Sequence, residues 1–393
     1  MRYFFSFVKL YMNAPIPAPQ KIYFRNLDSI RFFAAMMVVL QHDKFMHLDI
    51  QNAILRRFLF TMSDGETGVS IFFVLSGFLI TYLILSEIDL RGRFSLGKFY
   101  IRRILRIWPL YFAVVFIAFF IFPALSSLLK SPINQGGNLW YQFCFLSNFD
   151  VINIEKYRIG TEILMQNITW SVAIEEQFYA FWPLIFVFLP RKAILPAICF
   201  ILISSLLFRF YYFDDLTLLY FHTFSAMLYL GTGALTAYLI ITRQKVRTFF
   251  ERMGTGAILI LFILLFLSVM CKGIIFPSKI TLFISQPFFA ILFAFIIASQ
   301  SMIKKPSALE LGNIGFANKL GKYTYGIYLL HPIALEITHI IGKQLHVPDT
   351  LLPFLCLNVF GLILTFVISW LSYTYFESKF LNLKKRFAFI QKD

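Results

Sequence analysis

Long apolar runs recur along the whole chain and are separated by short segments rich in charged and polar residues. A helix needs roughly 20 consecutive apolar residues to cross the hydrocarbon core of a bilayer. The pattern therefore predicts an all-α fold, a polytopic membrane bundle of about ten transmembrane helices. The expected spans are 29–47, 67–86, 107–126, 169–189, 193–209, 217–241, 255–272, 279–299, 323–342 and 351–373.

The composition excludes an ordinary soluble protein. Hydrophobic residues make up 59% of the 393 positions and charged residues only 14%, more apolar surface than a soluble chain of this length can bury. The net charge of +16 comes from basic residues that lie between the apolar runs, which favours an orientation signal over nucleic-acid binding. The four cysteines are scattered singly, so no metal site is predicted.

The basic residues also predict the topology. Of the 36 Lys and Arg residues, 25 fall in the segments that would be cytosolic if both termini are inside, and 10 fall in the outer loops. The expected organisation is a single membrane domain over 1–393. Its non-spanning parts are an N-terminal cytosolic or interfacial tail at 1–26, a long outer loop at 127–168 and a basic cytosolic tail at 374–393.

The first span carries polar residues that a lipid-facing helix does not need. Arg31 and His42 are eleven residues apart, which places them on one face, about 20° and roughly 16 Å apart. Asp28 lies one turn before Arg31. In the simpler interpretation Arg31 reaches the lipid surface and pairs with Asp28, while His42 and Asp43 are interfacial. Ionisable residues are costly in lipid and usually mark a site, so the aligned pair favours a functional cleft.

A second cluster opens the span at 169–189. Ser171, Glu175 and Tyr179 follow one another at intervals of four and share a helix face, whereas Glu176 points elsewhere. At this depth they can meet His42, and a histidine beside a carboxylate is the usual arrangement of a general base. The alternative is an exposed helix start in which the dipole favours Glu.

A third cluster lies on the cytosolic side, in KFYIRRILRIWPLY. Lys98, Arg102 and Arg106 repeat at intervals of four, with Arg103 adjacent. Taken alone they read as a positive-inside anchor. Stacked arginines also hold phosphates by bidentate contacts. Together, the three clusters suit a long donor with phosphates at one end and a reactive group at the other, and acyl-coenzyme A has that shape.

Five segments in order resemble acyltransferase family three, the multi-pass O-acyltransferases that modify bacterial surface glycans. The first is the R-x10-H pattern at Arg31 and His42. The others are GETGVSIFFVLSGFLI, FYIRRILRIWPLY, WSVAIEEQFY and YTYGIYLLHPI. The resemblance covers nearly the whole chain. It implies acetyl-coenzyme A as donor, a carbohydrate hydroxyl as acceptor, His42 as the catalytic residue, Glu175 as its support, and donor binding by Arg31 and the arginines of 102–106.

These lines of argument give three sets of expected site residues. The catalytic set is His42, Glu175, Arg31 and Asp43. The donor-binding set is Arg102, Arg103, Arg106, Arg31, Lys98 and Tyr111. The substrate-binding set is Ser171, Tyr179, Glu176, His331 and Tyr328, although His331 also reads as a core histidine. The expected partners are the lipid bilayer, acetyl-CoA and the carbohydrate, in a bacterial cytoplasmic (inner) membrane, with no nucleic acid and no metal.

Several alternatives stay open at this stage. His42, oriented by Glu175 or Asp43, can take a proton from the attacking hydroxyl, or it can carry the acetyl group itself. A polytopic transporter or exporter would also have buried charges. A scaffold that has lost its chemistry is a third reading. The sequence leaves open whether the chain forms a homodimer.

Overall fold

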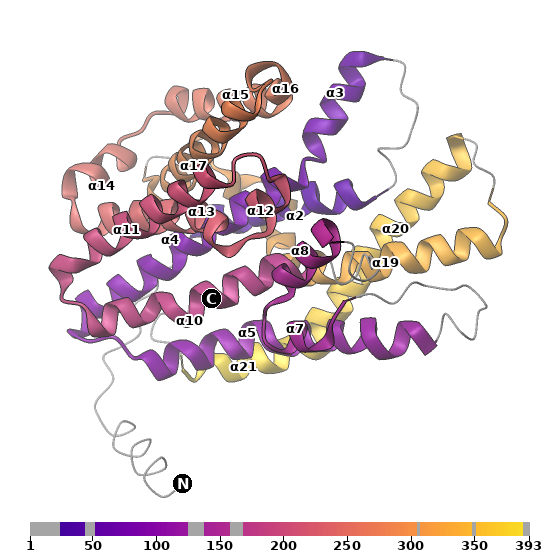
Figure 1. Cartoon of the computed structure of the whole chain (residues 1–393), viewed down its shortest axis with the longest axis horizontal. Coiled ribbons are helices and arrows are strands. Elements are labelled where there is room, and N and C mark those ends of the chain that lie inside the picture. The colour runs from indigo at the N-terminus through magenta and orange to yellow at the C-terminus, as the bar shows by residue number, and fades with distance from the viewer. Residues whose placement is uncertain are drawn as a thin grey trace, which may run out of the picture.

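Helices account for nearly all of the chain that the computed structural model describes, and the described residues contain no strand. The predicted all-α class is therefore confirmed for this part of the chain. The long helices run roughly side by side across Figure 1. The described residues are 24–43, 52–124, 137–157, 168–304, 307–347 and 351–387.

Each predicted span overlaps one long helix. The long helices are α2 (Arg25–His42), α4 (Gly65–Arg91), α5 (Leu96–Phe116), α10 (Thr169–Phe188), α11 (Arg191–Tyr211), α13 (Thr223–Thr242), α15 (Thr255–Met270), α17 (Lys279–Met302), α19 (Thr324–Gln344) and α20 (Leu351–Leu371). The short helices are α3 (Ala53–Met62), α7 (Leu139–Phe143), α8 (Ser147–Tyr157), α12 (Leu216–Phe221), α14 (Gln244–Glu251), α16 (Lys272–Ile275), α18 (Gly315–Leu320) and α21 (Ser378–Lys385).

Six helical segments within the described residues are long and apolar enough to cross a membrane, or seven if the bent pair α14 and α15 forms one span. The six are Ile54–Arg91, Leu96–Ala124, Arg191–Tyr211, Thr223–Thr242, Phe283–Met302 and Leu352–Lys385. The site helices α2, α10 and α19 are not among them, since each carries polar and charged side chains. Ten spans and two cytosolic termini stay a prediction.

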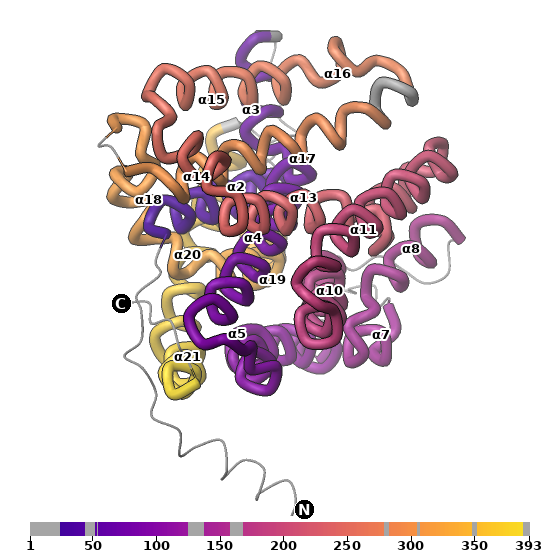
Figure 2. Tube along the Cα trace, turned by 90° about the vertical axis from the view of Figure 1, so that its left-hand side faces the viewer, coloured from indigo at the N-terminus to yellow at the C-terminus, as the bar shows by residue number. Residues whose placement is uncertain are grey.

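Two segments expected to lie outside the spans contain helix. Within the predicted outer loop 127–168, the described residues 137–157 form α7 and α8, and Lys156 of α8 forms an ion pair of 2.6 Å with Asp215 before α12. Within the predicted tail 374–393, the chain continues from α20 through a π-helical stretch into α21. In Figure 2, α21 lies beside α5, and the two helices are in contact.

The helices α4 and α13 approach closely because two glycines lie at their contact. A Cβ atom added to Gly77 would lie 1.9 Å from the carbonyl oxygen of Leu230, and one added to Gly233 would lie 2.0 Å from that of Val74. No other residue type fits either position without moving a backbone. Small residues of this kind allow helices to pack at short distance in a membrane. The pair forms the centre of the bundle around which the site helices are arranged.

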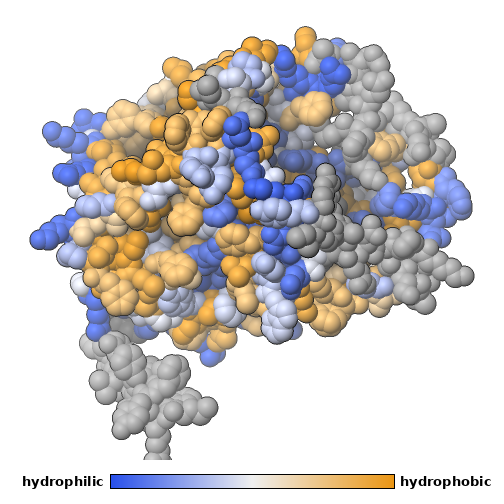
Figure 3. Space-filling view, viewed as in Figure 1, coloured by the Kyte–Doolittle hydropathy of each residue, from blue (hydrophilic) through white to orange (hydrophobic). Residues whose placement is uncertain are grey.

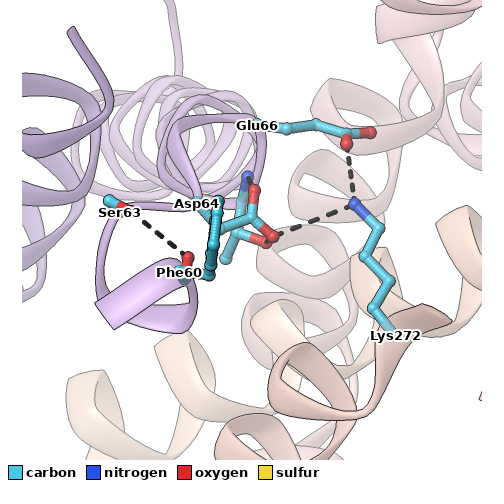
Figure 4. Close-up of polar contacts among 6 residues, drawn as sticks. Phe60, Ser63, Asp64, Glu66 and Lys272 are labelled. Carbon is cyan, nitrogen blue, oxygen red and sulfur yellow. Dashed lines mark hydrogen bonds and ion pairs between the residues drawn. The ribbon is translucent and has the colours of Figure 1, made fainter. Parts of the chain in front are cut away.

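A lysine after α15 fixes the start of α4 (Figure 4). Lys272 Nζ lies 2.7 Å from Glu66 Oε2 and 3.9 Å from Asp64 Oδ2, and Asp64 also caps α4 by accepting the backbone N–H of Thr67 at 3.0 Å. Burial lowers the pKa of Lys272, but the neighbouring carboxylates of Glu66 and Asp64 outweigh it, so the pKa of Lys272 is raised. The lysine therefore stays charged and ties α16 to the first turn of α4.

The surface has the apolar character expected of a lipid-facing bundle. Figure 3 shows hydrophobic residues over much of the visible face, with hydrophilic residues along its left edge and towards its right side. Large side chains such as Phe181 and Phe200 are each 71% exposed. Such exposure is costly in water and ordinary in lipid, so it agrees with a multi-pass membrane protein.

Candidate active site

The structure gathers most of the predicted donor-binding residues around one cavity of about 300 Å³ among α2, α4, α5, α10 and α19. We call it the basic cavity. Its lining combines arginine side chains with carboxyl and hydroxyl groups. Its principal polar residues are Arg31, Arg102, Arg103, Arg106, Glu175 and Tyr328. Lys384, from the segment predicted to be a basic tail, also lines it.

The arginines differ in how far they are already bound. Arg31 donates to Asp28, which is buried, and Arg102 donates to Glu87 Oε2 at 3.2 Å and to the carbonyl oxygen of Phe387 at 3.0 Å. Arg103 lies against the ring of Tyr179, 5.5 Å from its centroid, and its buried Nε atom has no hydrogen-bond partner among the described residues. Arg103 therefore has hydrogen-bonding capacity left for an anionic group, and Arg106 forms no hydrogen bond or ion pair with any residue that the structure describes.

Glu175 lies in the basic cavity with both carboxylate oxygens bound. Ser76 Oγ donates to Oε1 at 2.6 Å, and the Tyr179 hydroxyl donates to Oε2 at 3.0 Å. The predicted helix face of Ser171, Glu175 and Tyr179 thus does line one site. The expected pairing of Glu175 with His42 is not found, since these hydrogen bonds direct the carboxylate towards α4 and its own helix.

Besides the two histidines and Asp43, which are described below, the predicted site residues Tyr111, Glu176 and Lys98 lie outside the lining of this cavity. The Tyr111 hydroxyl donates to the carbonyl oxygen of Gln142 at 3.0 Å, which ties α5 to α7. Glu176 Oε2 accepts from Trp108 Nε1 at 2.8 Å, on another side of α10. Lys98 lies near the N-terminus of α5 and is half-buried. Lys98 shares a helix face with Arg102, and Tyr111 shares one with Ile107, but each lies one turn beyond the stretch of α5 that lines the basic cavity.

His42 pairs with a second histidine. Its Nδ1 atom lies 3.4 Å from Nε2 of His331 and 2.8 Å from the carbonyl oxygen of Val38, and the ring centroids are 5.1 Å apart. His331 is fully buried, and its own Nδ1 lies 3.2 Å from the carbonyl oxygen of Ile327. Carbonyl oxygens only accept, so both rings carry their proton on Nδ1 when neutral. This tautomer leaves Nε2 of His42 unprotonated, as a general base requires.

His42 lines a different cavity from Arg31. This second cavity, of about 530 Å³, lies beside the contact between α19 and α20 and includes Asp43, and we call it the α19–α20 cavity. Its polar lining comes from His42, Asp43, Glu336, Thr338, His339, Lys343, His346 and Asn358. The functional cleft expected along the shared helix face of Arg31 and His42 is therefore divided, because the two residues line separate cavities. Spacing along α2 fixes direction, but side chains of α19 fill the space between.

The partition between the two cavities consists of Tyr328, His331 and His42. Tyr328 lines the basic cavity, and its hydroxyl forms a hydrogen bond of 2.5 Å with Ser171 Oγ. The Tyr328 ring centroid is 6.3 Å from that of His331, which contacts His42 in turn. The two cavities thus meet across a chain of three side chains from α2 and α19.

Some residues at the site were missed from the sequence. Ser76 binds Glu175, Glu87 binds Arg102, and Glu336 and Asn358 line the α19–α20 cavity. A signal for Glu336 was present, because a carboxylate inside the apolar run 323–342 is itself unusual. No cluster of three or more His, Cys, Asp or Glu with metal-binding geometry occurs among the residues that the structure describes.

Comparison with known proteins agrees with this architecture. A family model described as "Acyltransferase domain" matches residues 24–374, which include every element of both cavities except α21. The chain belongs to this acyltransferase family. No solved structure matches it.

Two relatives indicate the range of the family. A protein of Staphylococcus aureus named "Putative O-acetyltransferase" is 26% identical over 91% of this chain. The chain spans 57% of the length of that relative. The peptidoglycan O-acetyltransferase OatA of Listeria monocytogenes is 31% identical over 41% of this chain and 24% of its own length.

Proposed function

We propose that this protein transfers an acetyl group from cytosolic acetyl-coenzyme A to a hydroxyl of a cell-surface carbohydrate, in the cytoplasmic membrane of a bacterium. The observation that carries the proposal is the basic cavity, which leads from unsaturated arginine donors to a cluster of hydroxyls one side chain from a histidine pair. The relatives named as O-acetyltransferases support the reaction class. Peptidoglycan is the first acceptor to test because OatA is named for it.

The residues of the basic cavity fit acetyl-coenzyme A. Its phosphates are anionic and suit Arg103, Arg106 and Arg31, and its extended pantetheine arm suits the apolar wall formed by Leu79 and Ile80. The thioester would then lie near Ser171 and Tyr328. Tyr328 closes this end, so its side chain has to rotate before the acetyl group reaches His42.

Transfer is then a direct displacement. Nε2 of His42 takes the proton of the acceptor hydroxyl while its oxygen attacks the thioester carbonyl, and a C–O bond forms as the C–S bond breaks. The imidazolium returns the proton to the departing thiolate. General-base action of this kind contributes about 10²–10⁴-fold. Nε2 of His331 is a second, longer acceptor for the Nδ1–H of His42 that the carbonyl oxygen of Val38 also accepts, and it stabilises the imidazolium, the role that the sequence had suggested for Glu175.

The test is transfer of radiolabelled acetyl from acetyl-coenzyme A to envelope glycan in washed membranes. We expect base-labile label in glycan with the wild type and none with His42→Ala at equal protein abundance. Activity in His42→Ala would overturn the assignment of the base. Uptake of an intact solute without acyl transfer would favour a transporter instead.

A further inference from the structure

The α19–α20 cavity has the size and lining of a small-molecule site. Its volume of about 530 Å³ lies within the roughly 300–1,000 Å³ of such sites. On α19 the lining positions 335, 338, 339 and 342 have the spacing of one helix face, and on α20 positions 354, 357 and 358 do so too. The cavity is therefore built from matching faces of two packed helices.

Close packing of the two helices beside the cavity depends on glycine. A Cβ atom on Gly342 would lie 2.6 Å from the side chain of Leu357. Gly342 itself lines the cavity, so the absent side chain leaves space next to Leu357. A larger residue at position 342 would fill part of the cavity that His42 also lines.

Glu336 is the group in this lining that most needs an explanation. It lies within α19, five residues after His331 and among largely apolar neighbours, and has no hydrogen bond or ion pair to any described residue. A carboxylate in such a helix is costly and by default marks a functional site. A carboxylate accepts several hydrogen bonds, and sugar hydroxyls are donors that can satisfy it.

The charges of the lining favour an uncharged ligand. The two carboxylates, Asp43 and Glu336, outnumber the one ammonium group, that of Lys343, so the cavity has no excess of positive charge for an acidic sugar. The amide of Asn358 adds a group that can both donate and accept. Leu335, Phe354 and Leu357 supply apolar contact, as the faces of sugar rings require.

We propose that the α19–α20 cavity binds the acceptor as a neutral saccharide, with Glu336 accepting hydrogen bonds from its hydroxyls and presenting one hydroxyl to His42. This rests on the proposed acetyl transfer and adds the acceptor's binding site, its chemical class and a specificity-determining residue. The donor and the acceptor then occupy separate cavities on opposite sides of the histidine pair.

The test compares Glu336→Gln, which keeps the size of the side chain, with Gln344→Ala, an exposed position on the same helix outside the cavity. Each variant is expressed in source cells that lack the wild-type gene, and base-released acetate is measured on total envelope carbohydrate. Each purified full-length protein is also titrated with coenzyme A. We expect Glu336→Gln to lower acetate at least about 10-fold, with coenzyme A affinity within about 2-fold, and Gln344→Ala to match the wild type.

The outcomes separate the two proposals. If the wild type adds no acetate or binds no coenzyme A, the proposed function fails and the acceptor site with it. If the wild type is active and Glu336→Gln equals it, the acceptor site alone is overturned. A joint loss of acetate and coenzyme A affinity in Glu336→Gln also overturns it, because the residue then supports the donor side or the fold.

Discussion

Replacing His331 tests whether the second histidine acts through His42. His331→Leu fills a similar volume and removes the acceptor that faces Nδ1 of His42 at 3.4 Å. A hydrogen bond to a charged group contributes about 1.5–3 kcal/mol, and the bond to His42 becomes charge-assisted only when that ring is protonated in the transition state. The separation of 3.4 Å is long, so we expect the lower part of this range, a fall in kcat of about 10-fold.

The assay is the initial rate of acetyl transfer at varied acetyl-coenzyme A with purified protein in lipid. We expect the KM for acetyl-coenzyme A to change less than about 2-fold, since His331 does not line the basic cavity. His331→Gln, whose amide oxygen can accept from His42, should recover part of the lost kcat. The reasoning is refuted if folded His331→Leu keeps the wild-type kcat, or if His331→Gln is no better than His331→Leu.

Three further predictions concern the donor, the packing and the charge pair. Arg103→Ala should raise the KM for acetyl-coenzyme A about 10-fold in the same assay with little change in kcat, and Arg103→Lys should recover only part, since Lys lacks the bidentate fork. Gly233→Val should lower the melting temperature or prevent folding, because overpacking costs about 1–3 kcal/mol or more. Gly254→Ala, with open space around it, should leave the melting temperature unchanged. If Gly233→Val melted at the same temperature as the wild type, the close contact between α4 and α13 would be contradicted. Lys272→Met should lower the melting temperature by a similar amount at pH 6 and pH 9, because a raised lysine pKa keeps the ion pair with Glu66 intact until the pH exceeds about 10. If the wild type and Lys272→Met melted at the same temperature at pH 9, the raised pKa of Lys272 would be contradicted.

Apolar runs were enough to locate the long helices, because a membrane helix is specified by its own composition. The expected spans 67–86 and 193–209 correspond to Gly65–Arg91 and Arg191–Tyr211. The polar helices were harder to classify. Their charges are bound within the protein: Asp28 binds Arg31 within α2, and Ser76 of α4 donates to Glu175 of α10. Hydropathy does not register such partners.

The site was predictable as sets of residues on a helix face and less so as pairs across helices. Periodicity placed Glu175 and Tyr179 together, and the structure agrees. It could not show that Ser76 rather than His42 meets Glu175, because the rotation of one helix does not reveal which helix lies opposite. His331 was noticed in its motif, yet its contact with His42 depends on how α19 packs against α2.

The side chains of Tyr328, His331 and His42 also have a consequence for the cell. Under the proposed function, neither the nucleotide nor the sugar has to traverse the bilayer, and only a two-carbon unit changes sides. A closed partition between two water-accessible hollows prevents leakage of protons and ions, so such an enzyme can work in an energised membrane without dissipating its potential.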